Sequence, residues 1–148
     1  AIRDQFLVNV REPAGVSVFA PESLLEKAFL PISVAGPHGL DIDDKSDLAY
    51  VACDGASVVV LDISTGLEKS VIPIGGGPDV AWLNRERHRF YCAIGSLGII
   101  EVIDTHKLAV DERVKTEEGA HTFTFDTKRQ RLYAFLPKSC RMAVYKET

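Results

Sequence analysis

Short apolar segments separated by polar turns follow one another along the whole chain. Between Pro37 and Gly77 we expect four strands, at 39–43, 48–53, 57–63 and 67–74, because β-branched and aromatic residues fill these segments and Asp, Ser and Gly separate them. The segments 58–63 and 99–103 are almost continuously apolar, which is typical of strands covered on both faces. The pattern therefore predicts strands buried between sheets, and no helix longer than about two turns.

The same strand pattern recurs with a period near forty residues. Tyr50, Tyr91 and Tyr133 stand at equivalent points, with spacings of 91 − 50 = 41 and 133 − 91 = 42. The segment 16–27 also matches 58–69 at an offset of 42. A period of this length indicates stacked supersecondary units. We expect two complete units, 37–77 and 78–119, between incomplete units 1–36 and 120–148.

Four-stranded antiparallel sheets stacked around an axis satisfy both observations, so the predicted fold is all-β, with the blades of a β-propeller. The chain would supply about fourteen strands in a single partial domain of roughly 3.5 blades. A closed ring of seven such units needs roughly 300 residues. We therefore expect either a homo-oligomer or the remainder of a longer chain to complete the ring, because open end faces favour association.

The repeat resembles the YVTN family of β-propellers, named for the strand that carries its tyrosine. Here Tyr50-Val51-Ala52-Cys53 stands where that family has Tyr-Val-Thr-Asn or Tyr-Val-Ala-Asn, whereas the units at Tyr91 and Tyr133 depart further. The resemblance implies a seven-bladed fold like those of surface-layer proteins and a sugar-lactone hydrolase. It also makes a periplasmic or extracellular location an expectation, although no signal peptide is visible.

Composition narrows the possible partners. The net charge of −4 over 148 residues gives no general attraction to nucleic acid, and aromatic residues do not interleave with the cations. No apolar run reaches the roughly 18 residues of a membrane span, so we expect no membrane insertion. The three cysteines have no metal-binding spacing and are expected to be buried thiols.

Three polar residues occupy one equivalent position near the predicted axis. They are His38, Asp79 and His121, with spacings of 79 − 38 = 41 and 121 − 79 = 42. Two imidazoles and a carboxylate are a plausible ligand set for a divalent metal ion in the central channel, or an acid–base pair. A structural role, capping the turn and bonding a neighbouring blade, explains the same residues. We expect the three side chains to converge on the axial side of their blades.

Two turns of the later units are basic, whereas the equivalent turn of the earlier unit, with Asp43, Asp44 and Asp47, is acidic. The face that carries these turns would meet an anionic partner or its own complement in another subunit. Ordinary solvated turns are the alternative. The candidate partner-binding residues are Arg85, Arg87, Arg89, Lys128, Arg129 and Arg131.

Asp62 and Asp104 also repeat, each before a tight turn, where we expect them to accept bonds from the turn backbone. The chain contains no G-x-S-x-G motif and no P-loop. The sequence therefore favours a non-catalytic binding or assembly module. The alternative is an enzyme acting in the channel, either lactone hydrolase-like or metal-dependent, and the sequence leaves this choice open.

Overall fold

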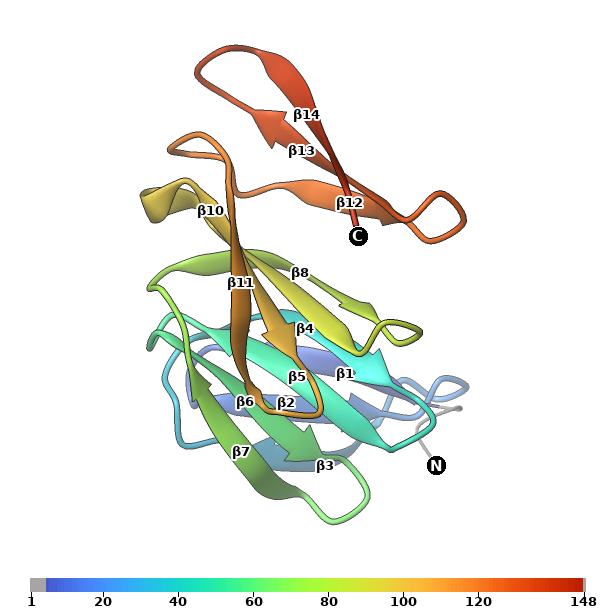
Figure 1. Ribbon diagram of the computed structural model, residues 1–148. Coiled ribbons are helices and arrows are strands. Elements are labelled where there is room, and N and C mark those ends of the chain that lie inside the picture. The colour runs from blue at the N-terminus through green and yellow to red at the C-terminus, as the bar shows by residue number, and fades with distance from the viewer. Residues whose placement is uncertain (1–4, 148) are drawn as a thin grey trace.

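The structure, a computed structural model, describes residues 5–147 and consists of four antiparallel sheets that follow one another along the chain (Figure 1). Two sheets have four strands, in the orders β4-β5-β6-β7 and β8-β9-β10-β11, and the sheets at the two ends have three, β1-β2-β3 and β12-β13-β14. These sheets lie within the four repeat units identified in the sequence. The all-β propeller-blade fold and the fourteen strands are as predicted.

The strands of the first half are β1 (Phe6–Val10), β2 (Gly15–Phe19), β3 (Glu26–Pro31), β4 (Pro37–Asp43), β5 (Leu48–Cys53), β6 (Ser57–Asp62) and β7 (Leu67–Pro73). Those of the second half are β8 (Pro78–Asn84), β9 (Arg89–Ile94), β10 (Ile99–Asp104), β11 (Ala109–Lys115), β12 (Phe123–Asp126), β13 (Arg131–Leu136) and β14 (Arg141–Lys146). The one helical segment among residues 5–147 is a three-residue 3-10 turn, η2 (Gly95–Leu97).

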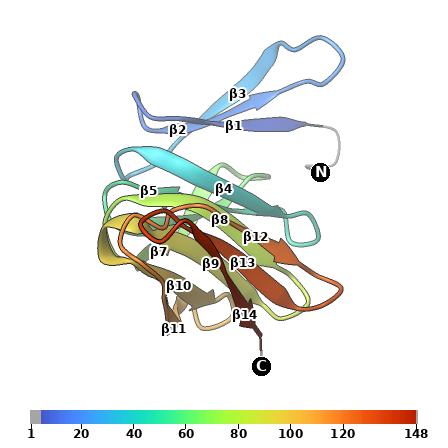
Figure 2. The same cartoon turned by 90° about the horizontal axis from the view of Figure 1, so that it is seen from above.

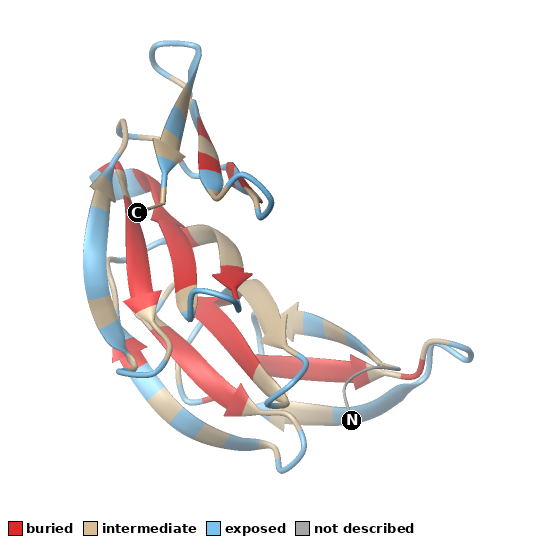
Figure 3. Cartoon of the chain, turned by 45° about the vertical axis from the view of Figure 1, so that its right-hand side comes forward, coloured by how far each residue is buried: buried red, intermediate tan, exposed pale blue. Residues whose placement is uncertain are grey.

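Three apolar clusters hold neighbouring sheets together, one at each junction. Val16 and Val51 belong to the cluster between the first two sheets, Tyr50 and Phe90 to the next, and Tyr91 to the last. The middle strands of the complete sheets carry most of the buried residues. The outer strands β7 and β11 are mostly exposed or partly buried, with Ile72 of β7 as a buried exception (Figure 3). Burial on both faces explains the continuous apolar runs of the sequence.

The innermost strands of the blades lie beside one another, as the view from above shows for β4, β8 and β12 (Figure 2). Gly39 permits a close approach of β4 to β8. A Cβ atom at Gly39 would lie 2.5 Å from the Asp79 carbonyl oxygen and 2.9 Å from the Ala81 Cβ. The absence of a side chain on β4 therefore sets how near β8, with Asp79, comes to the strand that carries His38.

One expectation about the cysteines is wrong. Cys53 and Cys92 are buried, but Cys140 is exposed, because it lies in the turn between β13 and β14 instead of in a strand. Burial raises the pKa of the Cys53 thiol to about 12, and also raises the pKa of Cys92, so both behave as small apolar residues.

The part of the chain that the structure describes contains no helix with the length and apolar character needed to cross a bilayer.

Candidate functional site

A glycine turn leads into the innermost strand of each of the last three blades. Gly36, Gly77 and Gly119 have φ of +69°, +67° and +89°, a left-handed backbone conformation that residues other than glycine rarely adopt. In each unit the residue that follows the glycine, Pro37, Pro78 or Ala120, is buried. The residue after that is the polar one, so the same local fold places His38, Asp79 and His121 at matching points.

The three predicted residues meet, with Asp79 between the two imidazoles. His38 Nε2 lies 3.6 Å from Asp79 Oδ1, and His121 Nε2 lies 4.0 Å from Asp79 Oδ2. Each pair joins two neighbouring blades. The predicted convergence is therefore observed, and the equal repeat offsets of the sequence correspond to one cluster in space.

The cluster lines an open hollow of about 510 Å³ at the end of the blades where the glycine turns lie. Arg11 and Asp54 join it from the β1–β2 and β5–β6 turns and form an ion pair with each other. His38 Nδ1 lies 3.7 Å from Asp54 Oδ1, so this imidazole faces one carboxylate on each side. The hollow is lined by Arg11, His38, Asp54, Gly77, Pro78, Asp79, Gly95, Ser96, Glu118, Gly119 and His121.

A backbone contact fixes how His121 faces the hollow. Its Nδ1 lies 2.8 Å from the Gly119 carbonyl oxygen, which can only accept, so Nδ1 carries the proton. In the neutral imidazole, Nε2 is then an acceptor pointed toward the Asp79 carboxylate. Two facing acceptors suit a cation or a hydrogen-bond donor placed between them.

The metal-binding prediction stays a prediction. Within residues 5–147 no group of three or more His, Cys, Asp or Glu side chains is arranged to hold a metal ion. The hollow is a polar surface depression, and His38, Asp79 and His121 have side chains that are 40%, 38% and 56% exposed.

Sequence reasoning missed Arg11 and Asp54. Asp54 stands in an Asp-Gly pair, which is accounted for by a turn alone. Arg11 belongs to the incomplete first unit, and the repeat pattern does not mark its position. Neither residue is at an equivalent position to the histidines, so the repeat pattern contains no signal for them.

The charged turns lie at one end of the blades, and part of their charge is neutralised within the chain. Arg85 pairs with Asp44 of the acidic turn at 3.5 Å and with Asp43 at 3.8 Å. The basic and acidic turns of neighbouring units therefore bind each other. Of the remaining predicted cations, Arg89 pairs with Glu112 and Glu147 and Arg129 with Asp126, whereas Arg87, Lys128 and Arg131 have exposed side chains with no ion pair among the described residues.

Asp62 and Asp104 act as predicted in their turns. Asp62 Oδ1 accepts bonds from the backbone N–H groups of Ser64 and Thr65, at 3.0 and 3.1 Å. Asp104 Oδ1 accepts from His106 and Lys107, at 2.8 and 2.9 Å. The bond from the Lys107 N–H is the main cause that lowers the pKa of Asp104 to about 2.

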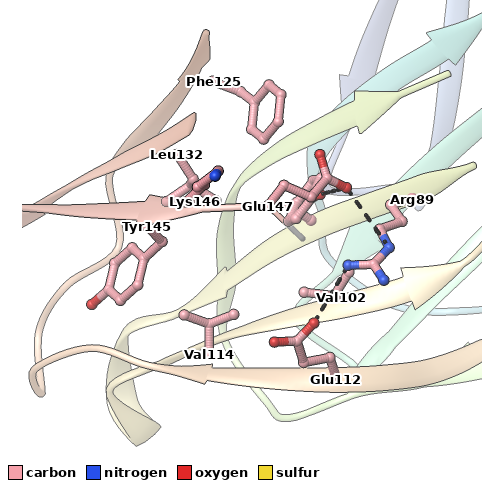
Figure 4. Close-up of a pocket in the computed structure, with 10 residues that line it drawn as sticks. Arg89, Val102, Glu112, Val114, Phe125, Leu132, Tyr145, Lys146 and Glu147 are labelled. Atoms are coloured by element: carbon pink, nitrogen blue, oxygen red, sulfur yellow. Dashed lines mark hydrogen bonds and ion pairs between the residues drawn. The ribbon is translucent and has the colours of Figure 1, made fainter. Parts of the chain in front are cut away.

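A second, much smaller pocket lies between the last two sheets (Figure 4). Glu147 is its centre: it accepts a bond from the Tyr91 hydroxyl at 2.5 Å and one from Asn84 Nδ2 at 2.9 Å, and Arg89 lies 3.7 Å away. The volume is about 40 Å³, so the pocket has room for little more than water. We regard it as a polar contact between blades.

Comparison with known proteins supports the fold and leaves the family open. No family model matches the chain, and no curated protein matches it. The resemblance to the YVTN family therefore stays a prediction. Among solved structures, the chain is similar to hydrazine synthase of Kuenenia stuttgartiensis, with a TM-score of 0.82 and 18% sequence identity over 97% of this chain. The chain spans 47% of the length of that protein, and identity this low shows a shared fold alone.

Proposed function

We propose that this chain is a non-catalytic binding module whose ligand site is the hollow around Asp79. One observation carries the proposal: His38, Asp79 and His121, which come from three different blades, face one another across the hollow at 3.6 and 4.0 Å. Loops and channel mouths held on a rigid scaffold are suited to recognition. The buried strands beneath the hollow supply that scaffold.

The charges around the hollow indicate the class of ligand. Asp79 and the acceptor atom of neutral His121 present lone pairs to the same space. Arg11 already neutralises Asp54. The ligand that fits is therefore a small polar molecule or ion that brings positive charge or N–H and O–H donors to Asp79.

A divalent metal ion held by His38, Asp79 and His121 is the second candidate. Tetrahedral zinc with N and O ligands at about 2.0–2.2 Å keeps its ligand atoms roughly 3.3–3.5 Å apart. The distances of 3.6 and 4.0 Å from the imidazoles to Asp79 are longer than this spacing, so the three side chains would have to rearrange to reach a common ion. A metal bound there would also be the starting point for the alternative function, a metal-dependent or lactone hydrolase-like enzyme.

The exposed cations in and beside the β8–β9 and β12–β13 turns form a candidate partner site. Arg87, Lys128 and Arg131 are exposed and have no ion pair among the described residues, and Arg85, Arg89 and Arg129 lie beside them in the same turns or at the starts of the adjoining strands. We propose that this cluster contributes to contact with an anionic partner, with salt-dependent strength.

Imidazole signals in an NMR spectrum test the ligand site directly. The chain has four histidines. His38 and His121 line the hollow. His88 and His106 lie against each other in two turns, with ring centroids 4.0 Å apart, and serve as internal controls. The probes are Zn²⁺, a small diamine and a sugar lactone. We expect Zn²⁺ or the diamine to shift His38 and His121 together, and Asp79→Ala to abolish the shift.

Two results would overturn the proposal. One is that no probe shifts His38 and His121 more than His88 and His106. The other is turnover of the lactone that Asp79→Ala removes, which would make the chain an enzyme instead of a non-catalytic binder. Far-UV circular dichroism of Asp79→Ala shows whether the blades remain folded.

A further inference from the structure

The last sheet has an apolar face that no residue in the described part of the chain covers. Phe135, Met142 and Val144 are 52%, 66% and 52% exposed on β13 and β14. A hollow of about 510 Å³ opens on the same sheet. It is lined by Thr122, Phe123, Thr124, Tyr133, Phe135 and Met142. We call this surface the C-face.

The repeat shows what covers such a face. At the repeat offset of 42, Tyr133, Phe135, Met142 and Val144 correspond to Tyr91, Ala93, Ile100 and Val102. The four earlier residues are 4%, 1%, 1% and 1% exposed, because the next blade packs on them with Phe123, Phe125, Leu132 and Ala134. One unit earlier, Tyr50, Ala52, Val58 and Val60 are buried in the same way. The matching partner of the C-face is therefore another blade of this kind.

The opposite end of the chain exposes the complementary side of a blade. Phe6 and Val8 on β1 are 52% and 48% exposed. On the neighbouring strand β2 they pair with Phe19 and Ser17. In the next unit the positions equivalent to Phe19 and Ser17 are Leu61 and Val59. These two residues pair with Ala49 and Val51 of β5. Ala49 and Val51 are the side of β5 that packs against the preceding blade. We call the surface of Phe6 and Val8 the N-face.

We propose that the C-face of one copy of this chain packs on the N-face of a second copy, and the reverse, so that two copies form a closed ring. Both faces are apolar, and they correspond to the two sides of every blade junction inside the chain. Head-to-tail contacts give a closed ring when the rotation per subunit permits.

The molar mass in solution tests this inference. The chain has a mass of 16.2 kDa, so light scattering should give twice this value over a range of dilutions. A constant 16.2 kDa would overturn the proposal, because it would show that no second copy covers the C-face. A mass that grows with concentration would overturn it as well, because it indicates open-ended association.

Single charged substitutions distinguish a head-to-tail ring from a symmetric contact between two C-faces. Met142→Asp and Phe6→Asp should each shift the mass toward that of one chain, and mixing the two variants should restore the dimer mass through the one junction that stays unmodified. Leu67→Asp, at a residue that is 63% exposed on β7, is the matched control and should leave the dimer intact. A Phe6→Asp variant that remains fully dimeric would contradict the head-to-tail arrangement. Phe135→Ser repeats the test if Met142→Asp fails to fold.

Discussion

Side chains in this protein act mainly across the junctions between blades. Asp79 faces a histidine from the blade on either side, and Glu147 binds Tyr91 of the preceding blade. The cluster of Asp79 with the two histidines was predicted from the repeat, because His38, Asp79 and His121 occupy equivalent positions in successive units. Glu147 could not be predicted in the same way: its equivalent in the preceding unit is Thr105, a neutral residue, so the repeat gives no sign of a buried carboxylate there.

The pair formed by Tyr91 and Glu147 gives a prediction at this scale. Burial raises the pKa of the Tyr91 hydroxyl, and the hydrogen bond to the Glu147 carboxylate raises it further. Replacing Glu147 with Gln removes the negative charge that disfavours the phenolate, so the pKa of Tyr91 should fall. Ultraviolet absorbance of the phenolate during an alkaline titration measures this, with Tyr91→Phe to assign the signal.

Glu112 supplies the matched control for that titration. Its carboxylate binds Arg89 at 3.4 Å in the same pocket but makes no described bond with Tyr91. Glu112→Gln should therefore change the pKa of Tyr91 less than Glu147→Gln does. Equal effects of the two substitutions would mean that general charge in the pocket, and not the hydrogen bond, governs this tyrosine.

The strands themselves follow closely from the sequence, and their ends follow from the turns. The prediction placed a strand at 48–53, which is where β5 lies, and the strands expected at 57–63 and 67–74 differ from β6 and β7 by one residue. The innermost strand was expected at 39–43, but β4 begins at Pro37. The left-handed turn at Gly36 and the packing of β4 against β8 set where this strand begins. The packing involves a second repeat unit, so the sequence of one unit does not predict it.

The glycine turns give a prediction at the scale of the element. Gly77 has φ of +67°, and no atom lies within 4 Å of the position where a Cβ would stand. Gly77→Ala should therefore cost about 1–2 kcal/mol of the free energy of unfolding through backbone strain alone. Gly76 has the same open surroundings without the positive φ, so Gly76→Ala should be nearly neutral. Denaturant unfolding compares the two variants, and similar losses would contradict the role given to the turn.

At the scale of the whole molecule, the repeat predicted stacked blades because each unit leaves both faces of its sheet apolar. The structure places three shared cores between the four sheets, and its similarity to a solved structure over 97% of the chain supports the same fold. The ion pair of Arg11 with Asp54 and the coupling of Arg85 to the acidic turn were not predictable. Both contacts depend on the rotation between neighbouring blades, and the spacing of residues in the sequence does not give this rotation.

The proposed function requires that His38, Asp79 and His121 form one ligand site. A crystal structure of the chain grown with the probe that shifts both imidazoles tests it most directly. We expect density for the probe between the two rings, within hydrogen-bonding or coordination distance of an Asp79 carboxylate oxygen. Histidine side chains turned away from Asp79, or a probe bound elsewhere on the blades while the hollow holds solvent alone, would contradict it.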